Sequence, residues 1–99
     1  MFNFNATLAQ AAGDDLNLWN ELRTVFIESS RKQIDLLKES QDCGQWNVIA
    51  MRLKGLAASF HAEELMQATD NALESKPGEI GSIELLEHCL GNLIKKTSD

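Results

Sequence analysis

The sequence predicts an all-α protein, an antiparallel four-helix bundle with a short extra helix at its N-terminal end. Apolar residues recur every three or four positions in four long segments, which is the spacing of amphipathic helices. Turn and capping residues leave only short connections between these segments, and short connections make neighbouring helices antiparallel. No segment shows the alternation of polar and apolar residues that is typical of a strand.

Composition narrows the class of protein further. The 99 residues suffice for one domain, 1–99, and its 43% apolar and 24% charged residues are ordinary for a globular protein. A net charge of −6 argues against nucleic acid and anionic membranes as partners. No window approaches the roughly 18 apolar residues of a membrane span. Because Met1–Asn5 also lacks the features of a secretion signal, we expect a cytoplasmic protein.

The first segments read as a short helix followed by a long one. Leu8–Ala12 predicts a brief helix packed across one end of the bundle, ended by Gly13 and followed by a capping Asp14 or Asp15. From Leu16 to about Glu39 there is no Gly or Pro, which predicts a helix of 24 residues. Its apolar positions are Trp19, Leu22, Phe26 and Leu37, with Leu18, Val25 and Ile34 beside them.

The third helix is the most sharply two-sided segment of the chain. Asp42 is its expected N-cap, and it reaches Ser59 or Phe60. At about 100° per residue one arc is apolar and buried. That arc contains Trp46, Ile49, Ala50, Leu53, Leu56, Ala57 and Phe60. The opposite arc contains Asn47, Val48, Met51, Lys54, Gly55 and Ala58, with Met51 near its centre.

His61 lies where the chain turns into the fourth helix. It either adopts a positive φ as the joint between the helices or lies in a bend without a left-handed residue. Glu63 and Glu64 open the fourth helix, which ends near Ser75–Gly78. Its expected inner face is Leu65, Ala68, Thr69 and Ala72, with Met66 and Leu73 at the margins. The last helix begins between Glu79 and Ser82, buries Ile83, Leu86, Leu90 and Leu93 beside Ile94, and carries Lys95 and Lys96 in its last turn.

The small residues near Met51 predict a docking face. Gly55 costs about 1 kcal/mol of helix propensity relative to Ala. A glycine kept inside a helix at that cost indicates that another surface approaches closely. Neither Gly55 nor Ala58 is large enough to cover Met51, and methionine is common at adaptable binding surfaces.

The run from Asp42 to Leu65 resembles the core of a histidine-containing phosphotransfer (HPt) domain. The motif of that family reads Ala-His-x-Leu-Lys-Gly, followed by small residues and a Gly-Ala turn into the next helix. This chain has Ala50 and Leu53–Gly55 in register, but Met51 stands where the family has its phosphorylated histidine. His61 stands where the family usually has the glycine of the turn.

The resemblance covers roughly Leu8 to Ile94 and implies a four-helix bundle in two-component signalling. A thioether has no proton to exchange and cannot replace the imidazole nucleophile, so Met51 cannot accept a phosphoryl group. In the family, the lysine at the position of Lys54 helps to neutralise the phosphoryl charge, and the glycine at the position of Gly55 admits the partner. We therefore expect a non-phosphorylatable docking module for the receiver domain of a response regulator or for a histidine kinase. The expected partner-binding residues are Asn47, Val48, Met51, Arg52, Lys54, Gly55 and Ala58.

Two alternatives stay open: phosphotransfer through His61, and a helical bundle recruited to an unrelated protein. His61 would lie about 15 Å along the axis from Met51 on a continuous helix. We expect no enzyme, cofactor or metal site. The chain shows no phosphate-binding glycine loop, no identifiable nucleophile-base pair, and no inward carboxylates to join His61 or His88 as ligands. Cys43 and Cys89 are expected to be free, partly buried thiols.

Overall fold

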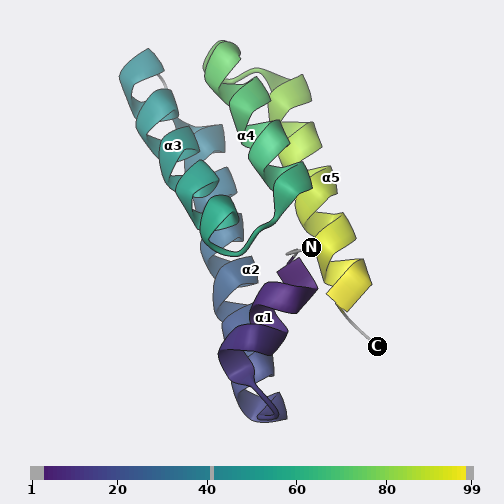
Figure 1. The fold of residues 1–99 in the computed structure, drawn as a ribbon. Coiled ribbons are helices and arrows are strands. Elements are labelled where there is room, and N and C mark those ends of the chain that lie inside the picture. The colour runs from purple at the N-terminus through teal and green to yellow at the C-terminus, as the bar shows by residue number, and fades with distance from the viewer. Residues whose placement is uncertain (1–3, 41, 98–99) are drawn as a thin grey trace.

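The computed structural model of the protein describes residues 4–40 and 42–97. Its helices are α1 (Phe4–Ala12), α2 (Leu16–Glu39), α3 (Cys43–Ser59), α4 (Glu63–Glu74) and α5 (Ile80–Thr97), as Figure 1 shows. These two ranges contain no strand, so the prediction of an all-α fold is confirmed. The predicted bounds of α2 hold to the residue, whereas α1 begins at least four positions before the predicted Leu8.

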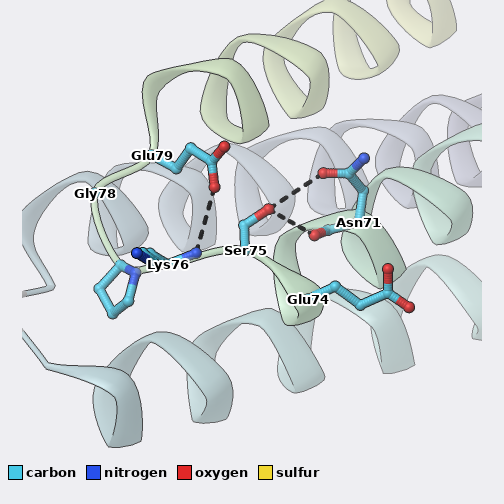
Figure 2. A pocket seen from close by; sticks show the side chains of 7 residues that line it. Asn71, Glu74, Ser75, Lys76, Gly78 and Glu79 are labelled. Atoms are coloured by element: carbon cyan, nitrogen blue, oxygen red, sulfur yellow. Dashed lines mark hydrogen bonds between the residues drawn. The ribbon is translucent and has the colours of Figure 1, made fainter.

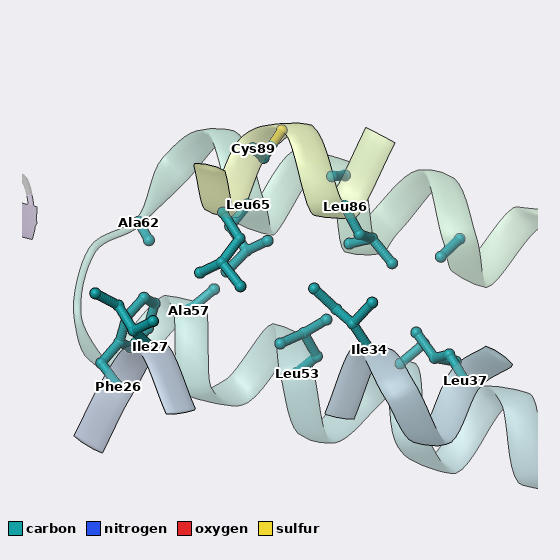
Figure 3. Close-up of a cluster of buried hydrophobic side chains, with 14 of the residues drawn as sticks. Phe26, Ile27, Ile34, Leu37, Leu53, Ala57, Ala62, Leu65, Leu86 and Cys89 are labelled. Carbon is teal, nitrogen blue, oxygen red and sulfur yellow. The ribbon is translucent and has the colours of Figure 1, made fainter. Parts of the chain in front are cut away.

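The helices from α2 to α5 pack around a shared apolar core. α3 packs against α2 and α4, α5 packs against α4 and α2, and α1 packs against α2. The inner faces predicted for α3 and α4 are buried or half-buried, and Figure 3 shows side chains of α2, α3, α4 and α5 meeting in the interior. The fully buried apolar side chains include Leu8, Phe26, Leu37, Trp46, Ala50, Leu53, Ala57, Leu65, Ala72 and Leu86.

Two aspartates begin the long helices as predicted. The Asp15 carboxylate accepts hydrogen bonds from the main-chain N–H groups of Asn17 (3.0 Å) and Leu18 (3.1 Å). The Asp42 carboxylate accepts one from the N–H of Gln45 at 2.8 Å. Each aspartate thereby satisfies first-turn donors that have no partner within the helix.

The turn between α3 and α4 resolves the alternative left open for His61. Its φ of 55° lies in the left-handed region, where histidine is one of the more tolerated residues after glycine. The His61 N–H donates to the Ala58 carbonyl (3.2 Å), and the N–H of Ala62 donates to that of Ala57 (2.9 Å). These are the two hydrogen bonds of a Schellman motif, and the buried Ala57 and Ala62 supply its apolar contact. The chain therefore reverses direction within three residues.

Three phenyl rings connect α1 to the other helices. The ring centroids of Phe4 and Phe26 lie 4.7 Å apart, and those of Phe26 and Phe60 lie 4.8 Å apart. Phe4 is also 6.1 Å from Phe60, which directly follows α3. The aromatic contact explains why α1 begins earlier than the apolar run from Leu8 predicts. It also places the first residue of α1 near Phe60, at the end of α3.

The N-terminal half of α2 departs from the predicted apolar stripe. Val25 is 57% exposed and Leu18 is 37% exposed, so neither belongs to the core. This half of α2 extends past the end of α3 and has α1 beside it in Figure 1. α3 does not reach this part of α2, so Val25 has no helix packed over it. Ile27 and Ser30 are buried further along the same helix.

Candidate docking surface on α3

The outward side of α3 is exposed where the helical spacing predicts. Met51 is 56% exposed and Val48 is 51% exposed, while Ala50 and Leu53 between and beside them are fully buried. We call the exposed and half-exposed set the α3 face. It consists of Asn47, Val48, Met51, Arg52, Lys54, Gly55 and Ala58.

Gly55 leaves the centre of the α3 face without a side chain beside Met51. A Cβ atom built on Gly55 meets nothing within 4 Å, so the packing of this chain does not require a glycine there. The residue nevertheless lies inside a helix, where glycine is unfavourable. What the glycine provides is open space above the backbone beside Met51. That space is available to a second surface.

Lys54 lies at the α4 side of the α3 face. Its Nζ is 2.7 Å from a carboxylate oxygen of Asp70, which projects from α4. Both side chains remain partly exposed, at 38% and 52%. Sequence reasoning did not include Asp70 in the site. The sequence feature that could have identified it is its helical spacing from Met66 and Leu73, which places Asp70 at the same margin of α4 as those two residues.

Arg52 lies at the edge of the α3 face opposite Lys54, toward α2. Together with Val48 and Ile49 it lines a groove of about 640 Å³ between α2 and α3. The α2 side of the groove contributes Leu36 and Glu39. Arg52 and Lys54 are two positions apart, which separates them by about 160° around the helix axis. The two cations therefore face different neighbours of α3.

A buried hydrogen bond fixes α3 against α4 beneath this surface. The indole N–H of Trp46 donates to the main-chain carbonyl of Ala72 at 2.5 Å. Both residues are buried, and a buried donor without a partner would be costly. The bond sets the position of α3 relative to α4. It therefore helps to hold Met51 outward and Lys54 opposite Asp70.

The hollow at the α4–α5 connection has a structural explanation. It measures about 750 Å³, and Figure 2 shows the polar residues around it. Ser75 Oγ donates to the Asn71 carbonyl at 2.8 Å and lies 2.6 Å from the hydroxyl of Ser82. The Lys76 N–H donates to the Glu79 carboxylate at 3.3 Å. These contacts join the end of α4 to the start of α5.

Cys89 and His88 border a second groove, of about 400 Å³, between α4 and α5. Burial, and to a lesser degree the charge of Glu64, raises the pKa of the Cys89 thiol. A thiol that stays protonated is a poor nucleophile. His88 Nε2 lies 3.3 Å from the side-chain amide of Asn92. Within residues 4–40 and 42–97, no three His, Cys, Asp or Glu side chains are placed to hold a metal ion.

The two cysteines differ in their surroundings. Both are free thiols. Cys89 is buried, in agreement with the sequence, but Cys43 is exposed and that part of the prediction is wrong. Cys43 is the first residue of α3, where the inner face of the helix has not yet begun.

His61 does not share the α3 face with Met51. It is exposed in the left-handed turn after α3, ten positions beyond Met51.

No helix in the described part of the chain is long and apolar enough to cross a membrane. No protein-family model, curated protein or solved structure matches this chain. The resemblance to HPt domains therefore depends on the sequence motif around Met51.

Proposed function

We propose that this protein is an HPt-like signalling module that has lost its phosphoacceptor and acts by docking. In this proposal α2 to α5 form an antiparallel four-helix bundle, α1 is the additional helix, and the protein works in the cytoplasm without enzymatic activity. Its partner is the receiver domain of a response regulator or a histidine kinase. By occupying that partner, it would compete with a true phosphotransfer protein.

The exposure of Met51 beside an open Gly55 is the observation that carries the proposal. Met51 is exposed at the position that corresponds to the family's histidine. Val48 adds a second exposed apolar side chain one turn away, and the space above Gly55 is open. An apolar centre with polar residues around it is the general anatomy of a protein interface. The surface around Met51 thus has the exposed apolar side chains and the open space that docking of a partner requires.

The side chain of Met51 supports docking and opposes phosphotransfer. Transfer from an aspartyl phosphate requires a nucleophile that forms a P–N bond as the P–O bond breaks. An imidazole nitrogen can do this, whereas a thioether is only a weak acceptor. Methionine instead offers a flexible apolar group that adapts to a partner. Transient signalling contacts of this kind have small interfaces, so we expect weak, reversible binding.

Calorimetric titration against purified receiver and kinase domains of the source organism tests the proposal. We expect binding to at least one of them, and we expect Met51→Asp and Gly55→Arg to abolish it. Val25→Asp is the matched control for the first change because Val25 is 57% exposed but lies on α2. Gly81→Arg is the control for the second, because Gly81 is also an exposed helical glycine with open space around its Cα. Binding that survives both α3 variants would contradict the proposal.

A further inference from the structure

We infer that the α3 face selects the unphosphorylated form of its partner's acidic site, because Asp70 compensates the charge of Lys54. This inference rests on the proposed function and specifies its regulation. It concerns a residue of α4, outside the motif around Met51. The partner chemistry in question is a receiver domain whose aspartate is either free or phosphorylated.

The first observation is the ion pair itself. Lys54 Nζ and Asp70 Oδ1 are 2.7 Å apart, a shorter distance than in the pairs of Lys38 with Asp35 and Glu87. At this distance the charge of the ammonium is directed to the carboxylate on α4. The lysine that would neutralise a partner's phosphoryl group is therefore already paired with a carboxylate within the chain.

The second observation is that the rest of the α3 face does not replace that charge near Met51. The thioether of Met51 has no hydrogen to donate. Arg52 lies about 100° around the helix axis from Met51. It is on the α2 side of the α3 face, where it lines the groove that also contains Glu39 and Asp42. Around Met51, the described residues thus present an apolar surface and an internally balanced ion pair.

A phosphoryl group changes the electrostatic balance at such a surface. It carries about −1.5 to −2 charges at neutral pH, and because the phosphorylated aspartate loses its own negative charge, the site gains about −0.5 to −1. With Asp70 in place, these charges meet a carboxylate as well as an ammonium, and Lys54 has to share its N–H donors between Asp70 and the phosphoryl group. Phosphorylation of the partner therefore weakens docking. The unphosphorylated partner leaves the ion pair intact.

The test compares two states of one receiver domain. Each receiver that binds in the calorimetric panel is titrated with Mg²⁺ alone and with Mg²⁺ plus beryllium fluoride, which mimics the phosphoryl group. The wild-type protein should bind the Mg²⁺-only state more tightly. Asp70→Asn should reduce this preference by about fivefold, the upper range for an exposed charge pair.

Asp35→Asn is the matched control. Asp35 is 63% exposed and lies 3.9 Å from Lys38 on α2, so this variant changes the net charge equally without altering the α3 face. It should keep the wild-type preference. The preference should also shrink with added salt, because the Debye length is about 10 Å at 0.1 M ionic strength. Thermal unfolding of both variants checks that the fold is retained.

The outcomes separate the two proposals. Equal or tighter binding of the fluoride-activated state by the wild-type protein would overturn the selectivity, and so would an unchanged preference in Asp70→Asn. Either result would leave the docking function standing. If the wild-type protein binds no receiver domain in either state, the selectivity is overturned. If it binds no kinase domain of the panel either, the docking function is overturned as well.

Discussion

The indole nitrogen of Trp46 on α3 lies 2.5 Å from the carbonyl oxygen of Ala72 on α4, and both residues are buried. This hydrogen bond joins the helix that carries Met51 to the helix that carries Asp70. A change in the position of α3 against α4 would alter both the apolar centre of the α3 face and the ion pair at its side. The same bond gives the first testable prediction.

Trp46→Phe should lower the free energy of unfolding by about 1–3 kcal/mol, because it removes the donor and leaves the Ala72 carbonyl unsatisfied. The smaller ring also leaves unfilled volume in the core. Urea denaturation followed by circular dichroism measures the change. Trp19→Phe on α2 serves as the control, since Trp19 is only half-buried and should cost less. Equal losses in the two variants would contradict the importance of the hydrogen bond.

Gly55→Ala should raise the free energy of unfolding by about 1 kcal/mol, because alanine is the better helix former and its Cβ meets nothing within 4 Å. The same methyl group should weaken partner binding by occupying the open space beside Met51. Gly91→Ala on α5 is the control, because Gly91 is also helical with an open Cβ position. It should stabilise the protein similarly and leave binding unchanged. Loss of binding in both variants would argue against a specific role for Gly55.

His61→Gly should raise the free energy of unfolding by about 0.5–1 kcal/mol, because glycine adopts the φ of 55° without a Cβ penalty. His61→Val should lower it, since a β-branched residue is strained in the left-handed region. Thermal and urea unfolding measure both effects. Ser59→Gly is the control because Ser59 lies in the last turn of α3, where glycine is unfavourable, so this variant should lower the free energy of unfolding. Stabilisation by valine would contradict the left-handed turn.

Cys89 should make the protein less stable at alkaline pH. Its thiol has a pKa raised above the ordinary value of 9.0 by burial, so the folded state holds this proton at pH values where the unfolded state releases it. Stability from this group is complete below pH 9.0 and is lost as the pH rises through the folded-state pKa. Urea unfolding of the wild-type protein and Cys89→Ala between pH 7 and 10.5 should show the wild type losing more. Parallel curves would contradict the raised pKa.

Met51→His should accept labelled phosphate from a phosphorylated receiver domain that binds the wild-type protein. The introduced imidazole would form the P–N bond while the aspartyl P–O bond breaks, and the label should be acid-labile. Wild-type protein should remain unlabelled. The double variant Met51→His, His61→Gln should label like the single one. Label on the wild-type protein that disappears in His61→Gln would instead support phosphotransfer through His61.

Local signals predicted most of the helix boundaries. Asp15 and Asp42 are helix-capping residues at the starts of α2 and α3, and their carboxylates make the expected hydrogen bonds. The spacing of apolar residues also predicted that Met51 is exposed while Ala50 and Leu53 are buried. These features depend on residues close in sequence, which is why periodicity and capping rules suffice.

Features that depend on distant residues were not predicted. Val25 has helical spacing with the core residues of α2 yet is exposed, because the other helices do not surround that part of α2. Asp70 lies 16 positions from Lys54, and its contact depends on how the turn at His61 aligns α3 with α4. The tilted ring contact between Phe4 and Phe26 likewise extended α1 beyond its apolar run. Each of these requires the relative placement of whole helices.

The contacting rings of Phe4, Phe26 and Phe60 have a practical consequence for working with this protein. A version trimmed to begin at α2 would uncover Phe26, which is otherwise completely shielded, and would leave Phe60 with one fewer neighbour. Exposed aromatic surface of this kind promotes aggregation. Aggregation of such a shortened protein would therefore indicate that the phenyl rings are no longer covered. Binding assays should use protein that retains α1.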